Sequence, residues 1–221
     1  MKVSKLEENI IFDFDGTLVD SSVAVNKLYD YFAKKYNISS ISSPETLATI
    51  KSLPLMEKMK KLGVPMRKLI AMSMEAKSMY ASFISEIKLK EGMIDILKGL
   101  SERKADMFIL SSNTAKNINK FLNLNNISFF KAVCSSRNIL KKDVEILKLL
   151  KKYRIEKENA IYVGDEVQDI FACRRIGLKI ISVSWGHDSL EVLKEYNADH
   201  LCTSIEDLYK CLIGDKKQAL V

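Results

Sequence analysis

The chain of 221 residues is 47% hydrophobic and 29% charged, which is typical of a soluble globular protein with one large domain or a core domain and a smaller insert. It has no apolar run of about 18 residues or more, and its first residues lack the apolar centre of a signal peptide, so we expect no membrane partner and a cytoplasmic location. The net charge of +7 fits an anionic substrate or a solvated surface, and because no basic stripe or arginine-rich arm occurs, we expect no nucleic-acid partner.

The first predicted element is a buried strand at residues 10–14, which carries two carboxylates at its end. Asp13 and Asp15 are two residues apart, so both side chains lie on the same side of an extended backbone. In an open α/β sheet, ligands bind at the carboxyl ends of the strands. Carboxylates held close together repel each other, and a metal ion or a shared proton is the usual compensation. A strand-ending turn would need only one Asp before Gly16, so the pattern favours a functional site.

The next stretch, residues 21–89, is predicted to be helical throughout. One apolar pattern begins at Val23, a second covers residues 46–62 with an interruption at Pro54, and a third covers residues 66–87. All three prolines of the chain fall in this stretch, where they separate helices. We expect a four-helix bundle inserted just after the first strand, with its methionine-rich stripe used for packing.

Strand and helix patterns alternate after this insert. Strands are predicted at residues 107–111, 132–134, 160–163 and 180–183, with a weaker one at 200–202, and helices at residues 115–122, 144–152, 170–176 and 189–195. This alternation predicts an α/β fold with a doubly wound parallel sheet.

Polar residues follow the strand predicted at residues 107–111. Ser112 and Asn113 lead from this strand into a helix. Hydroxyl and backbone N–H groups at the start of a helix can hold a phosphate group. The same residue types are common as plain helix caps, so this motif alone is weak.

Two later motifs carry charge. Lys141 and Lys142 precede a predicted helix and supply cationic side chains, although a lysine pair is more often a solvated charge. Asp165 follows Gly164 at the end of a predicted strand, and Asp169 lies four residues further on. Like charges at this spacing repel each other on a helix, and a metal ion would remove the penalty.

In their order along the chain, these motifs resemble the haloacid dehalogenase-like hydrolase superfamily. Its first motif, DxDGT, is present at residues 13–17, and its second, a Ser or Thr after a strand, matches Ser112. Its third, a Lys before a helix, matches Lys142 or Lys141, and its fourth, GDxxxD, is present at residues 164–169. The resemblance covers essentially the whole chain.

The helical insert is similar to the cap of this superfamily. The resemblance therefore implies a Rossmann-like hydrolase core at residues 1–20 and 90–221 and a helical cap domain at residues 21–89. Residues 162–166 and 183–186 are similar to stretches of phosphoglycolate-phosphatase-like members.

The resemblance also implies a role for each motif residue. Asp13 would attack phosphorus and form an aspartyl-phosphate, and Asp15 would act as general acid and then as general base. Mg²⁺ would be held by Asp13, Asp15 through its backbone carbonyl, and Asp165, with Asp169 outside the ligand set. The substrate would contact the remaining motif residues, Thr17, Ser112, Asn113 and Lys142.

The expected function is hydrolysis of a small phosphorylated metabolite, with phosphoglycolate as the first candidate and nucleoside monophosphates or sugar phosphates behind it. A sugar-phosphate mutase or phosphotransferase is an alternative, which the absence of histidine from residues 21–89 disfavours. A non-catalytic phosphate-binding protein of the same fold is a second alternative. We expect a monomer or a homodimer. Cap residues 51–61 and Arg67 are candidates for specificity, although solvated charge is the simpler explanation for them.

Overall fold

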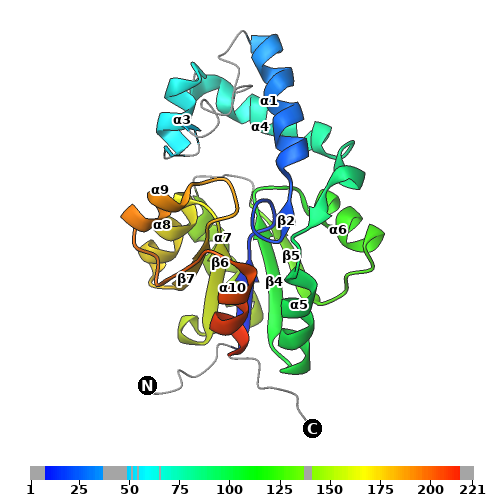
Figure 1. Cartoon of the computed structure of the whole chain (residues 1–221), viewed down its shortest axis with the longest axis vertical. Helices are drawn as coiled ribbons and strands as arrows, with labels where there is room; N and C mark the ends of the chain where they lie inside the picture. The colour runs from blue at the N-terminus through cyan, green and yellow to red at the C-terminus, as the bar shows by residue number, and fades with distance from the viewer. Residues whose placement is uncertain are drawn as a thin grey trace.

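The computed structural model describes residues 8–36, 49–50, 52–53, 55–64, 66–136 and 141–214. A sheet of six parallel strands forms the lower part of the molecule, in the order β5-β4-β1-β6-β7-β8 (Figure 1). Its strands are β1 (Asn9–Phe12), β4 (Asp106–Ser111), β5 (Phe130–Ser135), β6 (Ala160–Gly164), β7 (Lys179–Val183) and β8 (His200–Cys202). All six predicted strands are therefore confirmed, including the weakest, and the fold is the expected doubly wound, Rossmann-like α/β core.

Alternation along each strand builds two apolar layers, one on each face of the sheet. Ile10 and Phe12 of β1 belong to one buried cluster, whereas Ile11 between them belongs to the other. Successive side chains of a strand point to opposite faces, so a strand buried on both sides reads as a continuous apolar run. β1 lies between β4 and β6 in the centre of the sheet and is covered on both faces, which explains why its residues 10–12 are all apolar.

Helices cover both faces. On the face that includes Ile10 pack α5 (Met93–Glu102), α6 (Ala115–Leu124) and α10 (Ile205–Ile213). The opposite face, which includes Ile11, is covered by α7 (Lys142–Tyr153), α8 (Val167–Ile176) and α9 (Leu190–Glu195). The helices expected at residues 115–122, 144–152, 170–176 and 189–195 are all present, with boundaries that differ by at most three residues. Helices α5 and α10 were not among the sequence predictions.

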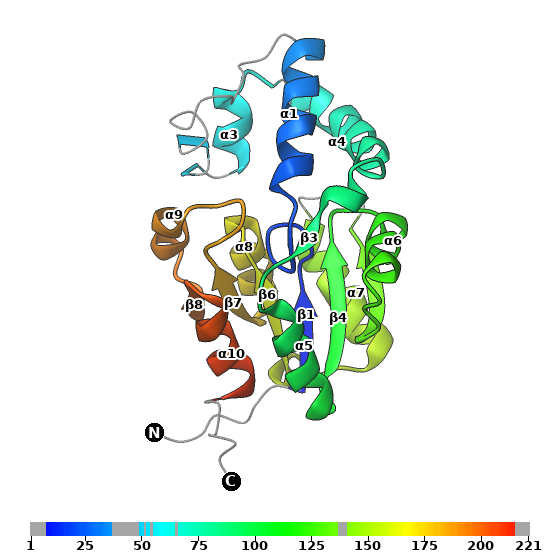
Figure 2. The ribbon, with the colours of Figure 1, turned by 45° about the vertical axis from the view of Figure 1, so that its right-hand side comes forward.

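The helical insert lies beyond the carboxyl ends of the strands (Figures 1 and 2). It contains α1 (Ser22–Tyr36), α3 (Leu55–Lys61), α4 (Met66–Tyr80) and the 3-10 turn η1 (Ile84–Glu86). A separate apolar cluster that includes Phe32, Leu62 and Met72 holds these helices together. The helix predicted before residue 54 falls largely outside the described residues.

The third predicted helix is shorter than expected. It was predicted to reach residue 87, but α4 ends at Tyr80 and a turn leads into η1. Ser82 explains part of the difference, because its hydroxyl donates to the backbone oxygen of Met79 at 2.7 Å. Local bonds of this kind compete with continuation of a helix.

Two short strands join the insert to the sheet. β2 (Val19–Asp20) and β3 (Lys88–Leu89) pair antiparallel, with Val19 opposite Leu89. The backbone N–H of Lys90 adds a further bond to the oxygen of Leu18 at 2.9 Å. Residues 21–89 were expected to contain no strand, so β3 is a correction to that prediction, whereas β2 lies just before this stretch. We call this pair of strands the junction ribbon.

Candidate active site

Asp13 lies directly beyond the end of β1. Its backbone N–H donates to the oxygen of Val163 at 2.8 Å, which continues the pairing of β1 with β6 by one residue. One carboxylate oxygen, Oδ1, accepts the N–H of Phe14 at 2.6 Å, and the other, Oδ2, accepts a bond from Lys142 Nζ at 2.6 Å. Asp13 is thus buried and held in one orientation at the edge of the sheet where ligands bind in such folds.

Lys142 is the first residue of α7, and its side chain is buried. Its ammonium contacts two carboxylates, those of Asp13 and Asp169. Burial alone would lower the pKa of Lys142, but these two negative charges outweigh it and hold the pKa well above the usual value. Lys141 is exposed. Of the two lysines that the sequence left open for the third motif, Lys142 is therefore the one that contacts Asp13.

Three carboxylates meet beside this lysine. Asp13, Asp165 and Asp169 are all buried, and one oxygen of each lies within 4.8 Å of the others. Burial raises the pKa of Asp169, and the negative charges of Asp13 and Asp165 add to this shift although Lys142 opposes it. Oxygen ligands in this number and at this spacing fit Mg²⁺, which prefers carboxylates and keeps several of its waters.

Asp165 accepts bonds from three donors. Thr17 Oγ1 donates to Oδ1 at 2.7 Å, and the backbone N–H of His187 donates to Oδ2 at 2.7 Å. The imidazole Nδ1 of His187 lies 2.8 Å from the same Oδ2. Burial opposes the charging of this imidazole, but the negative charge of Asp165 outweighs it and raises the pKa of His187 to about 10. Gly16 passes so close that a Cβ there would lie 2.3 Å from Asp165, and its φ of 75° also requires glycine.

Asp15 turns its carboxylate toward the helical insert. Oδ1 accepts a bond from the hydroxyl of Tyr80, the last residue of α4, and Oδ2 accepts one from Asn113 Nδ2 at 2.9 Å. Burial raises the pKa of Asp15 above that of an ordinary aspartate, although the two hydrogen bonds oppose this shift. A raised pKa suits a group that must carry a proton at one stage of a reaction.

Asn113 belongs to a chain of bonds that ties α4 to the sheet. Its Oδ1 accepts from Asn117 Nδ2 at 3.0 Å, and Asn117 Nδ2 also donates to the backbone oxygen of Lys77 at 2.9 Å. Asn117 is on α6, which begins after the N-cap residue Thr114. The last turn of α4 is therefore attached to Asp15 twice, through Tyr80 directly and through the two asparagines.

Described residues line two adjoining cavities at this end of the sheet. The first, about 210 Å³ and here called the aspartate cavity, has Asp13, Asp15 and residues 111–113 on the sheet side and residues of α1 and α4 on the other. The second, about 340 Å³ and here called the junction cavity, lies between α1, α3, the junction ribbon and the loop after β7. His187 and Glu166 line both cavities, so the two adjoin.

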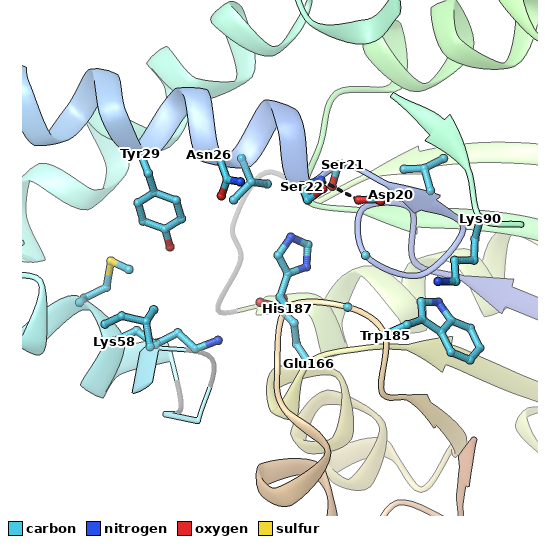
Figure 3. A pocket seen from close by; sticks show the side chains of 16 residues that line it. Asp20, Ser21, Ser22, Asn26, Tyr29, Lys58, Lys90, Glu166, Trp185 and His187 are labelled. Carbon is cyan, nitrogen blue, oxygen red and sulfur yellow. Dashed lines mark hydrogen bonds between the residues drawn. The ribbon is translucent and has the colours of Figure 1, made fainter. Parts of the chain in front are cut away.

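Figure 3 shows the junction cavity, with Tyr29 and Asn26 on α1 opposite His187 and Glu166. Lys58 reaches in from α3 and forms an ion pair with Asp188, which also accepts the backbone N–H of Val167 at 2.7 Å. Burial raises the pKa of Glu166 to about 7.

The predicted site residues thus fall into two groups. Asp13, Asp15, Ser112 and Asn113 line the aspartate cavity, with Lys142 in contact with Asp13 behind it. Thr17, in contrast, is fully buried, bonds to Asp165 and lines neither cavity among the described residues.

Sequence reasoning missed four residues at these cavities, Tyr80, Lys77, His187 and Glu166. His187 follows the predicted strand 180–183 by a few residues, so the rule that ligands bind at strand ends could have found it. Glu166 directly follows Asp165 of the fourth motif, so its position next to that motif was a usable signal. Tyr80 and Lys77 could not be found by this rule, because they are on a helix that follows no predicted strand in the sequence.

Comparison with known proteins agrees with this geometry. The model of a family described as haloacid dehalogenase-like hydrolase matches residues 10–183. The phosphoglycolate phosphatase of Synechococcus elongatus is 28% identical over 204 residues, which cover 92% of this chain and 96% of that protein. Pyrophosphatase PpaX of Oceanobacillus iheyensis is 24% identical over 219 residues, which cover 93% of this chain and 96% of that protein.

Solved structures share the fold. A haloacid dehalogenase-like family hydrolase from Streptococcus pneumoniae has a TM-score of 0.75 at 25% identity, over 91% of this chain and 96% of that one. A predicted phosphatase from Clostridium acetobutylicum has a TM-score of 0.77 at 23% identity, over 93% of this chain and 98% of that one. Both similarities extend over the helical insert as well as the sheet, because they cover more than nine-tenths of the chain.

Proposed function

The chain belongs to the haloacid dehalogenase-like hydrolase family, and we propose that it is a Mg²⁺-dependent phosphatase of small phosphate monoesters. The observation that carries this proposal is the placement of two carboxylates at one cavity. Asp13 is held by Lys142 and the N–H of Phe14, whereas Asp15, two residues later, faces the same cavity with a raised pKa. Asp13 is thus in contact with a cation, whereas burial biases Asp15 toward its protonated form.

These two carboxylates divide the first half of the reaction between them. Asp13 attacks phosphorus through a carboxylate oxygen, and the bond between phosphorus and the ester oxygen breaks. Asp15 gives its proton to the departing alcohol oxygen. The products of this half are an aspartyl-phosphate on Asp13 and the free alcohol.

In the second half, water replaces the alcohol. Asp15, now ionised, takes a proton from the water as its oxygen attacks phosphorus. The bond between phosphorus and Asp13 breaks, inorganic phosphate leaves, and both carboxylates return to their starting states. The same residue serves as acid and then as base, which explains why its environment must permit both forms.

Lys142 and Ser112 stabilise the phosphoryl group during transfer, since negative charge is spread over its oxygens. Mg²⁺, when bound by Asp13 and Asp165 together with the backbone carbonyl of Asp15, supplies the positive charge that lets a phosphate approach four carboxylates. Asp169 keeps Lys142 in place through their ion pair, and Thr17 keeps Asp165 in place through its hydroxyl. Asn113 acts on the substrate site by holding Asp15.

We take phosphoglycolate as the first candidate substrate, because the relative from Synechococcus elongatus bears that activity in its name and is similar over nearly its full length. Pyrophosphate is the next candidate, from the PpaX relatives. A mutase is less well supported, since the stretch from residue 21 to residue 89 contains no histidine to transfer protons. No helix in the described part of the chain is long and apolar enough to cross a bilayer, and we keep a cytoplasmic location and a monomer or homodimer as proposals.

The test is hydrolysis of p-nitrophenyl phosphate with Mg²⁺, with excess EDTA and with Ca²⁺ in place of Mg²⁺. We expect turnover with Mg²⁺ alone, because Ca²⁺ takes more ligands at longer distances and spoils the attack geometry of Asp13. Asp13→Asn removes the attacking charge and should reduce turnover to background. Asp106→Asn, which changes an exposed aspartate in an ion pair with Lys131, should leave turnover unchanged. Full activity in EDTA, or in the Asp13 variant, would contradict the proposal.

A further inference from the structure

The side of the aspartate cavity that faces the sheet is rich in carboxylates, whereas its opposite side carries a cation. Lys77 and Ser73, both on α4, line the cavity across from Asp13 and Asp15. Residues four apart on a helix lie on the same face, so the ammonium and the hydroxyl form one polar patch. We call Ser73 and Lys77 the roof pair.

The roof pair has hydrogen-bonding capacity to spare. Lys77 Nζ has one contact within the described residues, at 3.5 Å to the backbone oxygen of Ser136, and no carboxylate pairs with it there. Ser73 Oγ has no hydrogen-bond partner in the same part of the chain. Desolvation lowers the pKa of Lys77, so an anion that arrived beside it would relieve the penalty of its partial burial.

Three other cations near the reacting carboxylates already contact a carboxylate. Lys142 contacts Asp13 and Asp169, and Lys58 pairs with Asp188. His187, which also lines the aspartate cavity, is bonded to Asp165. Among the described residues that line this cavity, Lys77 is therefore the cation whose charge remains available to a ligand.

The backbone of Lys77 is held in place relative to the reacting groups. Its backbone oxygen accepts from Asn117, which also bonds to Asn113, and Asn113 bonds to Asp15. One turn later on α4, Tyr80 donates to Asp15 directly. A binding group held on rigid elements in this way loses little freedom when a ligand arrives.

We propose that the roof pair binds a second anionic group of the substrate, so that the preferred ester carries a carboxylate or a second phosphate besides the phosphate that Asp13 attacks. This inference rests on the proposed phosphatase function and narrows its substrate class. The volume of about 210 Å³ is below the roughly 300–1,000 Å³ of sites for drug-sized ligands, which agrees with a substrate of a few heavy atoms beyond its phosphate.

The experiment compares three esters and pyrophosphate on purified protein with Mg²⁺. 2-Phosphoglycolate carries a carboxylate, 2-hydroxyethyl phosphate replaces it with a neutral alcohol, pyrophosphate tests a second phosphate, and p-nitrophenyl phosphate reports basal chemistry. Lys77→Met keeps the length of the side chain and removes its charge. We expect kcat/KM for the preferred doubly anionic substrate to fall about tenfold or more, mainly through KM, with a smaller loss for the neutral ester.

Two further variants separate a specific role from a structural one. Lys77→Arg keeps the charge and should restore most of the preference for the doubly anionic substrate. Lys68 is on the same helix, but its ammonium lies over the ring of Tyr36 and it lines neither cavity. Lys68→Met should therefore leave kcat/KM unchanged for all four compounds.

The outcomes separate the inference from the function on which it rests. Equal losses for the charged and the neutral ester in Lys77→Met would show that the lysine is merely structural and would overturn the inference. So would a wild-type protein that hydrolyses p-nitrophenyl phosphate but has no preference for either doubly anionic substrate. A wild-type protein that hydrolyses none of the four compounds would instead refute the phosphatase proposal, and this inference with it.

Discussion

Asp15 receives one hydrogen bond on each carboxylate oxygen, and the two donors come from different parts of the chain. Asn113 follows β4 of the sheet, whereas Tyr80 ends α4 of the insert. Burial raises the pKa of the Tyr80 hydroxyl, so it stays protonated and acts as a donor. The proposed acid and base is thus oriented jointly by the sheet and by the insert.

Tyr80→Phe should lower kcat by about tenfold to hundredfold, with little change in KM. The substitution removes one bond to a charged group, of about 1.5–3 kcal/mol, but leaves the phosphate contacts on the sheet side in place. Steady-state kinetics with p-nitrophenyl phosphate measures the effect. Tyr31→Phe is the matched control, because its hydroxyl also bonds to a carboxylate, that of Glu75, away from both cavities. If KM rose and kcat did not change, Tyr80 would bind substrate rather than position Asp15.

The sequence predicted the residues of the site that directly follow strands. Asp13, Asp15, Ser112 and Asp165 stand where strand ends meet, so the alternating pattern and the motif order were enough to bring them together. Lys77 and Tyr80 were not predictable in this way. They reach the site from α4 of the insert. The position of α4 over the sheet depends on contacts with residues far away in the sequence, which a local sequence pattern cannot reveal.

The strands were predicted or missed according to their length. Strands of three or more residues carry an apolar pattern that can be recognised, but the two-residue strands of the junction ribbon are too short for any period to appear. The ends of α4 and α8 depended on local hydrogen bonds of Ser82 and of the capping box at Glu166 and Asp169. Those bonds are visible only once the backbone is placed.

The junction between the insert and α5 depends on one glycine. Gly92 is the N-cap residue of α5, with φ of 78°, and a Cβ added there would lie 2.8 Å from Ile205 Cγ2 of α10. A left-handed conformation at a residue with a side chain costs about 1–2 kcal/mol. The short contact with Ile205 adds to this strain.

Gly92→Ala should therefore lower the free energy of unfolding more than Gly63→Ala does. Gly63 has nearly the same φ, 70°, but a Cβ there has no atom within 4 Å, so its substitution reports backbone strain alone. Urea unfolding of both variants measures the difference, which represents the contact with Ile205. Equal losses would mean that α10 moves aside without penalty.

At the scale of the whole molecule, a buried ion pair between described residues joins α3 to the sheet side of the fold. Lys58 on α3 contacts Asp188, which lies in the loop after β7 and also caps the N-terminal N–H of α8 at Val167. A buried pair that loses one partner leaves an uncompensated charge, which is strongly destabilising. The contact therefore holds the insert against the sheet only while both partners are present.

Lys58→Met should loosen the insert without unfolding the sheet. We expect faster hydrogen exchange in α3 and in the loop at residues 184–189, with exchange in β1 and β6 unchanged. Lys60→Met, which changes an exposed lysine on the same helix, is the control. Unchanged exchange in α3 would show that the apolar cluster around Phe32 and Leu62 alone fixes its position.

The junction ribbon has a mechanical consequence. Two independent connections would let the insert tilt, twist and slide over the sheet, but here each connection is hydrogen bonded to the other at Val19 and Leu89. A paired ribbon bends across its plane far more easily than its strands separate. If the bonds of Tyr80 and Lys58 to the sheet side were broken, the ribbon would therefore favour bending of the insert over twisting or sliding. Such a bend would change the distance between α4 and the carboxylates of the sheet side, and with it the width of the aspartate cavity.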